Sequence, residues 1–204
     1  MANAVYPLYK QNLLAGTSGF DLDQTGANGT YAALIDGAAY TYSAAHDFYN
    51  DAAAGEVGTP QEITTPTVVN GTFDGDNVTF TAVSGATVEI IILYRKNAGA
   101  NTTWPVVLYL DTSVTGLPVT PNGGDITITW NASGIFTLSD RRFKENVEEV
   151  GVLGRLPVYS YTYLGSDHPH LGFMAQDVEK IVPDAVVDFG AFKAVDYGLA
   201  IACQ

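Results

Sequence analysis

The sequence LSDRRFKEN, at residues 138–146, separates two parts of the chain that differ in composition. Before it, short apolar runs alternate with glycine- and asparagine-rich turns, whereas charged residues crowd together after it. The same stretch holds Ser139 and, five residues later, Lys144. A serine hydroxyl becomes an effective nucleophile when a base removes its proton, and a neutral lysine amine is such a base. Residues 138–146 therefore mark a predicted domain boundary and the strongest candidate catalytic pair.

The composition is that of a globular protein, with 47% hydrophobic and 15% charged residues in a chain of 204. No apolar run reaches the roughly 18–20 residues that a membrane-spanning helix needs. The first sixteen residues lack the pattern of a secretory signal, so we expect synthesis in a cytoplasm. The net charge of −13 argues against a nucleic-acid partner, because such a surface repels phosphates. The single cysteine, Cys203, excludes an internal disulfide framework.

The first two thirds of the chain have the pattern of a β protein. Residues 1–29 are rich in small and polar residues, and we expect them to form an N-terminal arm. Runs of strand character follow at residues 30–36, 39–44, 62–69, 77–83, 86–95, 104–111, 125–130 and 134–138. Turn signals such as GTFDGDN separate these runs. Short strands at this spacing predict an antiparallel β-sandwich or jelly roll over residues 30–138.

The last third of the chain predicts a small α+β domain. Residues 157–164 alternate like a strand, and residues 176–182 fit a short helix. Pro183 should end that helix, because proline disfavours the helical conformation in the residue before it. Residues 192–195 are a candidate last strand, and Asp196 is a suitable N-cap for a final helical turn.

Three blocks in this last third carry a resemblance to a known family. They are LSDRRFKEN, then HLGFMAQDVEKIVPDAV at residues 170–186, then AVDY at residues 194–197. In this order they resemble the self-cleaving intramolecular chaperone domain of phage endosialidases, tailspikes and fibres. The signature of that family is a serine–aspartate pair and a lysine, an AQ-(D/E)-VE helix with a proline, and a V-D-Y segment. The resemblance covers residues 139–204 and implies a domain that brings three chains together.

The resemblance also implies a role for the candidate pair. Ser139 would attack the adjoining main-chain carbonyl with Lys144 as general base, so that the bond beside Ser139 is hydrolysed once. A lysine with the ordinary pKa of about 10.4 is neutral in only roughly one molecule in a thousand near pH 7.4. Burial or the neighbouring cations Arg141 and Arg142 would raise that fraction. The alternative is that Ser139 lies in a turn and Lys144 is a solvated surface lysine.

Other groupings in the sequence support weaker hypotheses. Asp167, His168 and His170 lie close together but lack a fourth metal ligand. Asp74 and Asp76 lie in FDGDN, which lacks the downstream glutamate of a calcium loop. We therefore predict neither a metal site nor a cofactor.

Aromatic residues and one histidine raise two further possibilities. Trp104, Trp130 and the tyrosines could form a sugar-binding face, although packing in the core is the usual role of such residues. His46 and Asp47 are better explained as neighbours in a loop than as a catalytic pair. Residues 109–130, YLDTSVTGLPVTPNGGDITITW, also resemble part of a family of small phage structural proteins.

The sequence thus predicts a bacteriophage virion protein of the tail-fibre or tailspike kind, assembled in the host cytoplasm. The expected partners are further copies of the chain in a homotrimer, other virion proteins and, as an alternative, a host surface receptor or glycan. As an enzyme it would be at most a single-turnover serine peptidase that acts on itself. The alternative function is a capsid decoration or head-fibre protein that keeps an uncleaved, inactive chaperone fold as a tip or trimer clamp.

Overall fold

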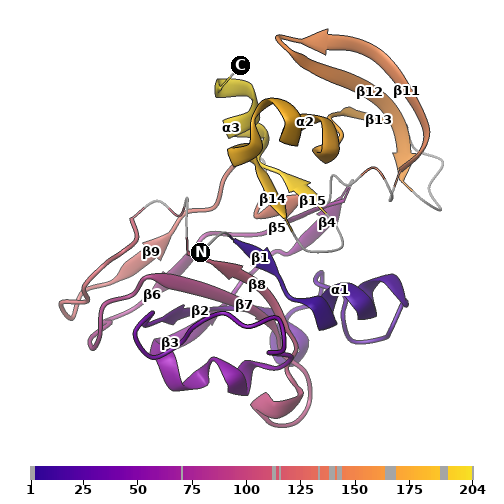
Figure 1. The fold of residues 1–204 in the computed structure, drawn as a ribbon. Coiled ribbons are helices and arrows are strands. Elements are labelled where there is room, and N and C mark those ends of the chain that lie inside the picture. The colour runs from indigo at the N-terminus through magenta and orange to yellow at the C-terminus, as the bar shows by residue number, and fades with distance from the viewer. Residues whose placement is uncertain are drawn as a thin grey trace. The chain divides into compact units, whose positions relative to one another are not determined.

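The structure is a computed structural model, in which mainly β-structure is arranged in antiparallel sheets with a few short helices (Figure 1). This confirms the prediction of a mainly β protein. The described residues are 3–69, 71–111, 114, 116–132, 134–137, 141, 144–163, 169–188 and 193–203. No helix within them is both long and apolar enough to cross a membrane.

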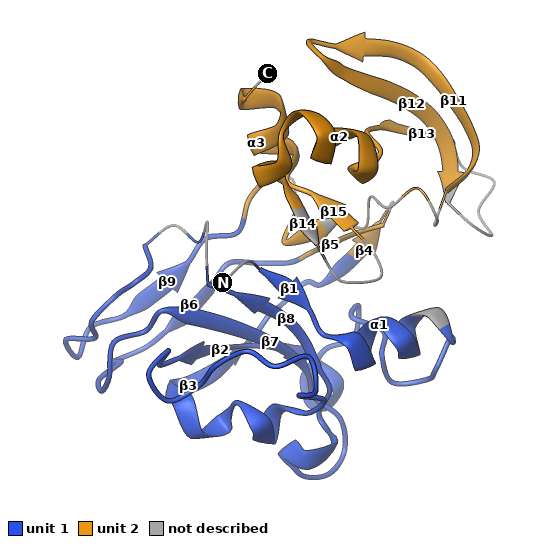
Figure 2. Cartoon of the chain, viewed as in Figure 1, with its two compact units in different colours: residues 1–67, 75–130 blue, residues 68–74, 131–204 orange. Residues whose placement is uncertain are grey.

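The chain divides into two compact units (Figure 2). Unit 1 comprises Met1–Thr67 and Gly75–Trp130, and unit 2 comprises Val68–Asp74 and Asn131–Gln204. Unit 2 therefore includes a short segment, Val68–Asp74, from the first part of the chain. This segment lies within the range 30–138 that the sequence assigns to the first domain.

Unit 1 contains a five-stranded antiparallel sheet with the strand order β1-β8-β7-β2-β3. Its strands are β1 (Ala4–Val5), β2 (Thr30–Ile35), β3 (Glu56–Glu62), β7 (Ile90–Arg95) and β8 (Val106–Leu110). Every residue of β7 is buried, as the continuous apolar run in this part of the sequence predicts for a strand covered on both faces. The strand lies between β2 and β8, so it is the centre around which the sheet is built.

The rest of unit 1 is a two-stranded sheet and several short helical segments. The pair is formed by β6 (Val78–Phe80) and β9 (Ile126–Ile128), which are antiparallel. The helical segments are α1 (Pro7–Leu14) and the 3-10 turns η1 (Gly26–Asn28), η2 (Tyr49–Asp51), η3 (Ala53–Gly55) and η4 (Asn101–Thr103).

Two predicted strands of unit 1 differ from the structure. Residues 39–44 form no strand, because Tyr40 and Tyr42 instead pack their rings on a core cluster from a loop. Residues 62–69 were predicted as one strand, but β3 ends at Glu62 and β4 (Thr67–Val69) begins five residues later. Thr65 interrupts the strand with a φ of +47°, in the left-handed region, and Pro66 follows it.

The start of the chain packs into unit 1. Ala4 and Val5 pair with Tyr109 and Leu108 at one edge of the sheet, where the sequence led us to expect an arm. The helix α1 then begins with a proline at its first position, where no hydrogen bond from the main-chain nitrogen is needed.

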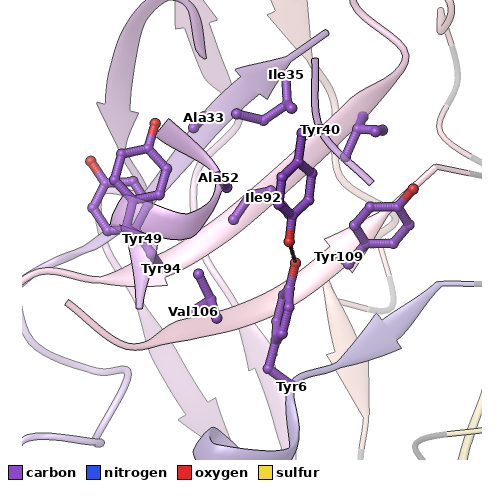
Figure 3. Packing of buried hydrophobic residues seen from close by; sticks show 11 residues of the cluster. Tyr6, Ala33, Ile35, Tyr40, Tyr49, Ala52, Ile92, Tyr94, Val106 and Tyr109 are labelled. Atoms are coloured by element: carbon purple, nitrogen blue, oxygen red, sulfur yellow. Dashed lines mark hydrogen bonds between the residues drawn. The ribbon is translucent and has the colours of Figure 1, made fainter. Parts of the chain in front are cut away.

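The core of unit 1 is rich in tyrosine (Figure 3). Its buried members are Tyr6, Ala33, Ile35, Tyr40, Tyr49, Ala52, Ile90, Ile92, Tyr94, Val106 and Tyr109. The hydroxyls of Tyr6 and Tyr40 form a hydrogen bond with 2.7 Å between their oxygens. The Tyr40 hydroxyl is also hydrogen-bonded to Nδ1 of His46, at 2.9 Å. Burial, together with the bond to Tyr40, raises the pKa of Tyr6 far above the ordinary value of 10. The hydroxyls are thus neutral and paired, which is what a buried polar group requires.

Unit 2 combines short sheets with two helices. A three-stranded sheet consists of β11 (Lys144–Leu153), β12 (Leu156–Tyr163) and β13 (Pro169–Gly172), in that order. The other strands are β14 (Val186–Asp188), which pairs with β15 (Lys193–Val195), and β10 (Phe136–Thr137), which pairs with β5 (Thr72–Asp74) beside β4. The helical segments are α2 (Ala175–Ile181), η6 (Pro183–Ala185) and α3 (Tyr197–Ala202).

The helices of unit 2 form where the sequence predicts them. The helix α2 ends at Ile181, two residues before Pro183, and it packs Ala175 and Val178 into a small apolar core. Asp196 accepts a hydrogen bond at 2.9 Å from the main-chain nitrogen of Leu199, which confirms it as the N-cap of α3.

The tyrosine pairing in unit 1 gives a first prediction. Tyr6→Phe should lower the free energy of unfolding by about 1 kcal/mol, because it removes one buried hydrogen bond and keeps the ring. Tyr6→Ala should cost about 3–5 kcal/mol, because it also leaves a cavity. Urea denaturation followed by near-ultraviolet circular dichroism measures both.

The matched control is Tyr42→Phe, since the Tyr42 hydroxyl makes no hydrogen bond within the described part of the chain. This variant should stay within about 0.5 kcal/mol of the wild type. Equal losses in Tyr6→Phe and Tyr42→Phe would show that the bond between Tyr6 and Tyr40 adds nothing to stability.

Candidate functional site

Lys144 is a buried lysine at the start of β11, opposite Tyr163 of β12. Only 6% of the residue is exposed, and its Nζ donates a hydrogen bond at 2.8 Å to the main-chain oxygen of Phe173. The same nitrogen lies 3.9 Å from the centre of the Tyr161 ring. The alternative interpretation of Lys144 as a solvated surface residue is therefore wrong.

A bulge in β11 accompanies the burial of Lys144. The pairing of β11 with β12 shifts register between Glu145 and Glu148, and Asn146 has a φ of +52°. The Asn146 side chain donates a hydrogen bond at 3.1 Å to the Thr162 hydroxyl, which holds the bulge against β12. An irregularity of this kind bends a strand and changes the direction of its side chains. Beyond the bulge, most of β11 is exposed to solvent.

The other member of the predicted pair, Ser139, lies outside the described residues, as do Asp140 and Arg142. The Ser139–Lys144 pair therefore stays a prediction. Arg141 is described, and its main-chain nitrogen donates a hydrogen bond at 3.1 Å to Oε1 of Gln176 on α2. The main chain is thus attached to α2 at a point two residues after Ser139.

The three sequence blocks meet at the turn between β13 and α2, residues 172–176. Lys144 contacts the main-chain oxygen of Phe173, while the hydroxyl of Tyr197 accepts a hydrogen bond at 3.1 Å from the Phe173 nitrogen. The Phe173 and Tyr197 rings stack with their centres 5.1 Å apart. A Cβ atom at Gly172 would lie 2.5 Å from the Tyr197 hydroxyl oxygen, so glycine is the residue that this approach allows. The turn therefore joins the first, second and third blocks.

A charged group lies at the start of α2. Asp177 accepts hydrogen bonds at 2.8 Å from the Tyr159 hydroxyl and from Lys180. Partial burial alone would raise the pKa of Asp177, but these two bonds and the charges of Lys180 and Arg141 outweigh it and lower that pKa below 3.8. The Arg141 guanidinium also lies 5.6 Å from the centre of the Tyr159 ring. An ionised Asp177 thus ties α2 to β12, close to Arg141 in the first block.

The sequence-based hypothesis missed the residues that contact Lys144 and Arg141. The main-chain oxygen of Phe173 has no signature in a sequence, because any residue supplies one. The rings of Tyr159 and Tyr161 could have been found, since the alternation PVYSYTY places both on one face of β12. Gln176 lies in the signature helix, but its bond to Arg141 joins residues 35 positions apart.

The other candidate groups do not form a site in the described part of the chain. No group of three or more histidine, cysteine, aspartate or glutamate side chains within it is placed to hold a metal ion. Asp167 and His168 lie outside the described residues, and the ring of His170 lies 5.9 Å from that of Tyr161. Asp76 accepts a hydrogen bond from the Thr64 hydroxyl, as a residue in a turn does.

The buried amine gives a second prediction. Lys144→Met keeps the aliphatic stem but removes the hydrogen bond to Phe173, so unit 2 should lose about 1.5–3 kcal/mol of stability. Hydrogen exchange of the main-chain amides of β12 measures the local free energy of opening. The matched control is Lys180→Met, because the Lys180 side chain is 71% exposed and its ion pair should contribute less than about 1 kcal/mol. Unchanged protection of β12 in Lys144→Met would mean that the amine adds no net stability.

Comparison with known proteins identifies a family for the C-terminal part of the chain. The model of the family described as chaperone of endosialidase, peptidase S74, matches residues 139–187. A search of curated proteins found no match to the chain. The matched residues include Lys144, the turn at residues 172–176 and α2, whereas Tyr197 lies beyond them. The C-terminal part of the chain, at residues 139–187, is thus a chaperone-of-endosialidase domain, as the three sequence blocks predict.

Proposed function

We propose that the chain is a bacteriophage virion protein of the tail-fibre or tailspike kind, with an intramolecular chaperone at its C-terminal end. The observation that carries the proposal is the family match at residues 139–187, which contains the turn where the sequence blocks meet. Domains of this family are typical of phage tail fibre and endosialidase proteins and generally act in trimers. Unit 1 is then the β-rich body, for which a β-sandwich or jelly roll is our proposed architecture.

Exposed apolar side chains on the sheet of unit 2 support self-association. Val150, Val152 and Leu153 on β11 are 52%, 61% and 46% exposed, and Leu171 on β13 is 71% exposed. Large apolar side chains that a sheet leaves exposed can be covered by contact with another protein. We propose that copies of the chain cover these residues in a homotrimer.

The trimer gives a third prediction. The intact chain should sediment as a trimer at micromolar concentration, and Val152→Asp with Leu171→Asp should shift it toward the monomer. The reason is that a carboxylate buried in an apolar interface without a partner is costly. Leu13→Asp is the control, because Leu13 is a leucine of unit 1 that is 41% exposed. A wild-type chain that sediments as a monomer contradicts the trimer.

We further propose that unit 2 cuts its own chain once. Lys144, as a neutral amine, takes the hydroxyl proton of Ser139, and the hydroxyl oxygen attacks the adjoining main-chain carbonyl. The C–N bond breaks, the released nitrogen takes the proton, and water then hydrolyses the ester to a carboxyl group and the free serine. One peptide bond and one water molecule are consumed. Because the nucleophile is part of the same chain as its target, no translational freedom is lost on approach.

The environment of Lys144 bears on this step in two opposite ways. Burial disfavours the charged form of an amine and so favours a base. The Phe173 oxygen and the face of the Tyr161 ring favour the charged form. These last two contacts support the second candidate function, an uncleaved virion protein whose chaperone fold serves as a tip or trimer clamp.

Self-cleavage gives a fourth prediction. The purified wild-type chain should convert to two fragments divided beside residue 139, as intact mass spectrometry measures. Ser139→Ala and Lys144→Ala should stay whole, because one lacks the nucleophile and the other the base. Ser160→Ala and Lys180→Ala are matched controls and should cleave like the wild type.

Ser139→Ala is the decisive variant, since Lys144→Ala also removes a structural hydrogen bond. The proposal of self-cleavage is contradicted if the wild-type chain stays whole or if the Ser139→Ala chain is still cut. The first of these results favours the uncleaved tip or clamp.

A further inference from the structure

A row of parallel aromatic rings lies in unit 1. The Tyr94 ring lies nearly parallel to that of Tyr31, with centres 5.7 Å apart and planes within 20°, and to that of Trp104, with centres 5.5 Å apart and planes within 4°. Tyr49 stacks on Tyr94 with centres 4.0 Å apart, and both rings are almost fully buried (Figure 3). Tyr31 and Trp104 are only partly buried. The row therefore joins two buried rings, Tyr49 and Tyr94, to two partly exposed ones, Tyr31 and Trp104.

These rings line a pocket of about 500 Å³. Glu56 and Lys96 contribute the charged groups of its lining, and the loop that contains Gly99 and Asn101 contributes polar main chain. Small-molecule sites have volumes of roughly 300–1,000 Å³ and combine aromatic walls with a few polar groups. The pocket has the size and composition of such a site.

Hydrogen bonds hold the walls of the pocket in place. Nε1 of Trp104 donates at 3.0 Å to the main-chain oxygen of Asn97, and the Tyr31 hydroxyl donates at 3.3 Å to that of Gly26. The Tyr49 hydroxyl donates to the Glu56 carboxylate, which keeps that carboxylate at the pocket. A site whose side chains are already fixed loses little conformational freedom when a ligand binds.

The two charged groups indicate the kind of ligand. Nζ of Lys96 lies 4.9 Å from the centre of the Tyr31 ring and 5.2 Å from that of Trp104. No carboxylate among the described residues forms an ion pair with it. An ammonium group only donates hydrogen bonds and a carboxylate only accepts them. Because the lining holds one ammonium group and one carboxylate, the pocket has no net charge that would attract an ion. Adjacent hydroxyl groups on a neutral ligand can accept from the ammonium and donate to the carboxylate.

We propose that this pocket binds a neutral hexopyranose unit of a saccharide. The flat C–H face of the sugar ring packs on the exposed end of the aromatic row, at Tyr31 or Trp104, and its hydroxyls bond Lys96 and Glu56. Core packing alone does not account for the arrangement, because the ends of the row and both charged groups reach the surface. The site lies wholly in unit 1, so it adds a binding activity that does not depend on chaperone action or self-cleavage.

Fluorescence of Trp104 tests the proposal directly. The chain has two tryptophans, so Trp130→Phe leaves Trp104 as the single reporter. The probes are the methyl pyranosides of glucose, galactose and mannose, with methyl glucuronide and glucosamine as charged counterparts and cyclohexanol as an apolar one. At least one neutral pyranoside should shift the Trp104 emission, and the shift should saturate in the millimolar range. That pyranoside should bind at least tenfold more tightly than its charged counterparts.

Two variants locate the binding. In the Trp130→Phe background, Lys96→Met and Glu56→Gln should each weaken binding of that pyranoside by about tenfold, and Glu56→Gln keeps an acceptor for Tyr49. Lys10→Gln is the charge-matched control in unit 1 and should bind unchanged. Ser139→Ala should also bind unchanged, which separates this test from that of self-cleavage.

Three results would overturn the saccharide site. The first is the absence of saturable binding by any neutral pyranoside. The second is binding by both pocket variants that equals that of the Trp130→Phe parent. The third is tighter binding of a charged counterpart or of cyclohexanol than of the neutral pyranosides.

Discussion

The contact between the Lys144 amine and the main-chain oxygen of Phe173 is the interaction on which the order of unit 2 depends. A buried amine without a hydrogen-bond partner costs several kcal/mol, so the start of β11 and the turn after β13 have to stay together. The same turn receives the Tyr197 hydroxyl from the start of α3. One turn thus connects segments that are far apart in the sequence, and this explains why the three blocks occur together although each is short.

Unit 1 meets the same constraint in a different way. Its core contains tyrosines where aliphatic side chains are more usual. The hydroxyls of Tyr6 and Tyr40 are paired with each other, and those of Tyr49 and Tyr109 donate to the carboxylates of Glu56 and Asp111. Burial raises the pKa of Tyr40, as it does for Tyr6, so these groups carry no charge into the interior at neutral pH. Tyr31 and Trp104 are partly buried and continue this core toward the surface as a row of rings beside Tyr94.

Sequence patterns predicted the elements whose stability is decided locally. The apolar run of β7, the alternation of β12, the α2 helix ended by Pro183 and the Asp196 cap each depend on neighbouring residues. The charged strand β11 was missed, because its exposed residues show no apolar alternation. The edge strand β3 was placed too late for the same reason, since its residues are mostly polar and few are buried.

The pairing of strands that are far apart in the chain could not be predicted from the sequence. Phe73 of β5 pairs with Phe136 of β10 across 63 positions, which draws Val68–Asp74 into unit 2. The composition of neither strand predicts which strand it pairs with, because each is short and consists of residues that are common in strands. The candidate site shows the same limit: the sequence drew attention to Lys144, but its contacts at Phe173 and Tyr161 come from strand register and from the turn after β13.

The structural role of Lys144 and its proposed catalytic role are compatible in one amine. A neutral amine still carries N–H groups, so it can donate to the Phe173 oxygen while its lone pair accepts a proton from another group. The Phe173 oxygen and the face of the Tyr161 ring both favour the positively charged form of the amine. The carbonyl fixes where the nitrogen lies, and burial of the side chain favours the neutral amine that a base requires. A lysine held in this way provides an anchor in either protonation state, so a fold that depends on it is compatible with the proposed reaction, which uses it once.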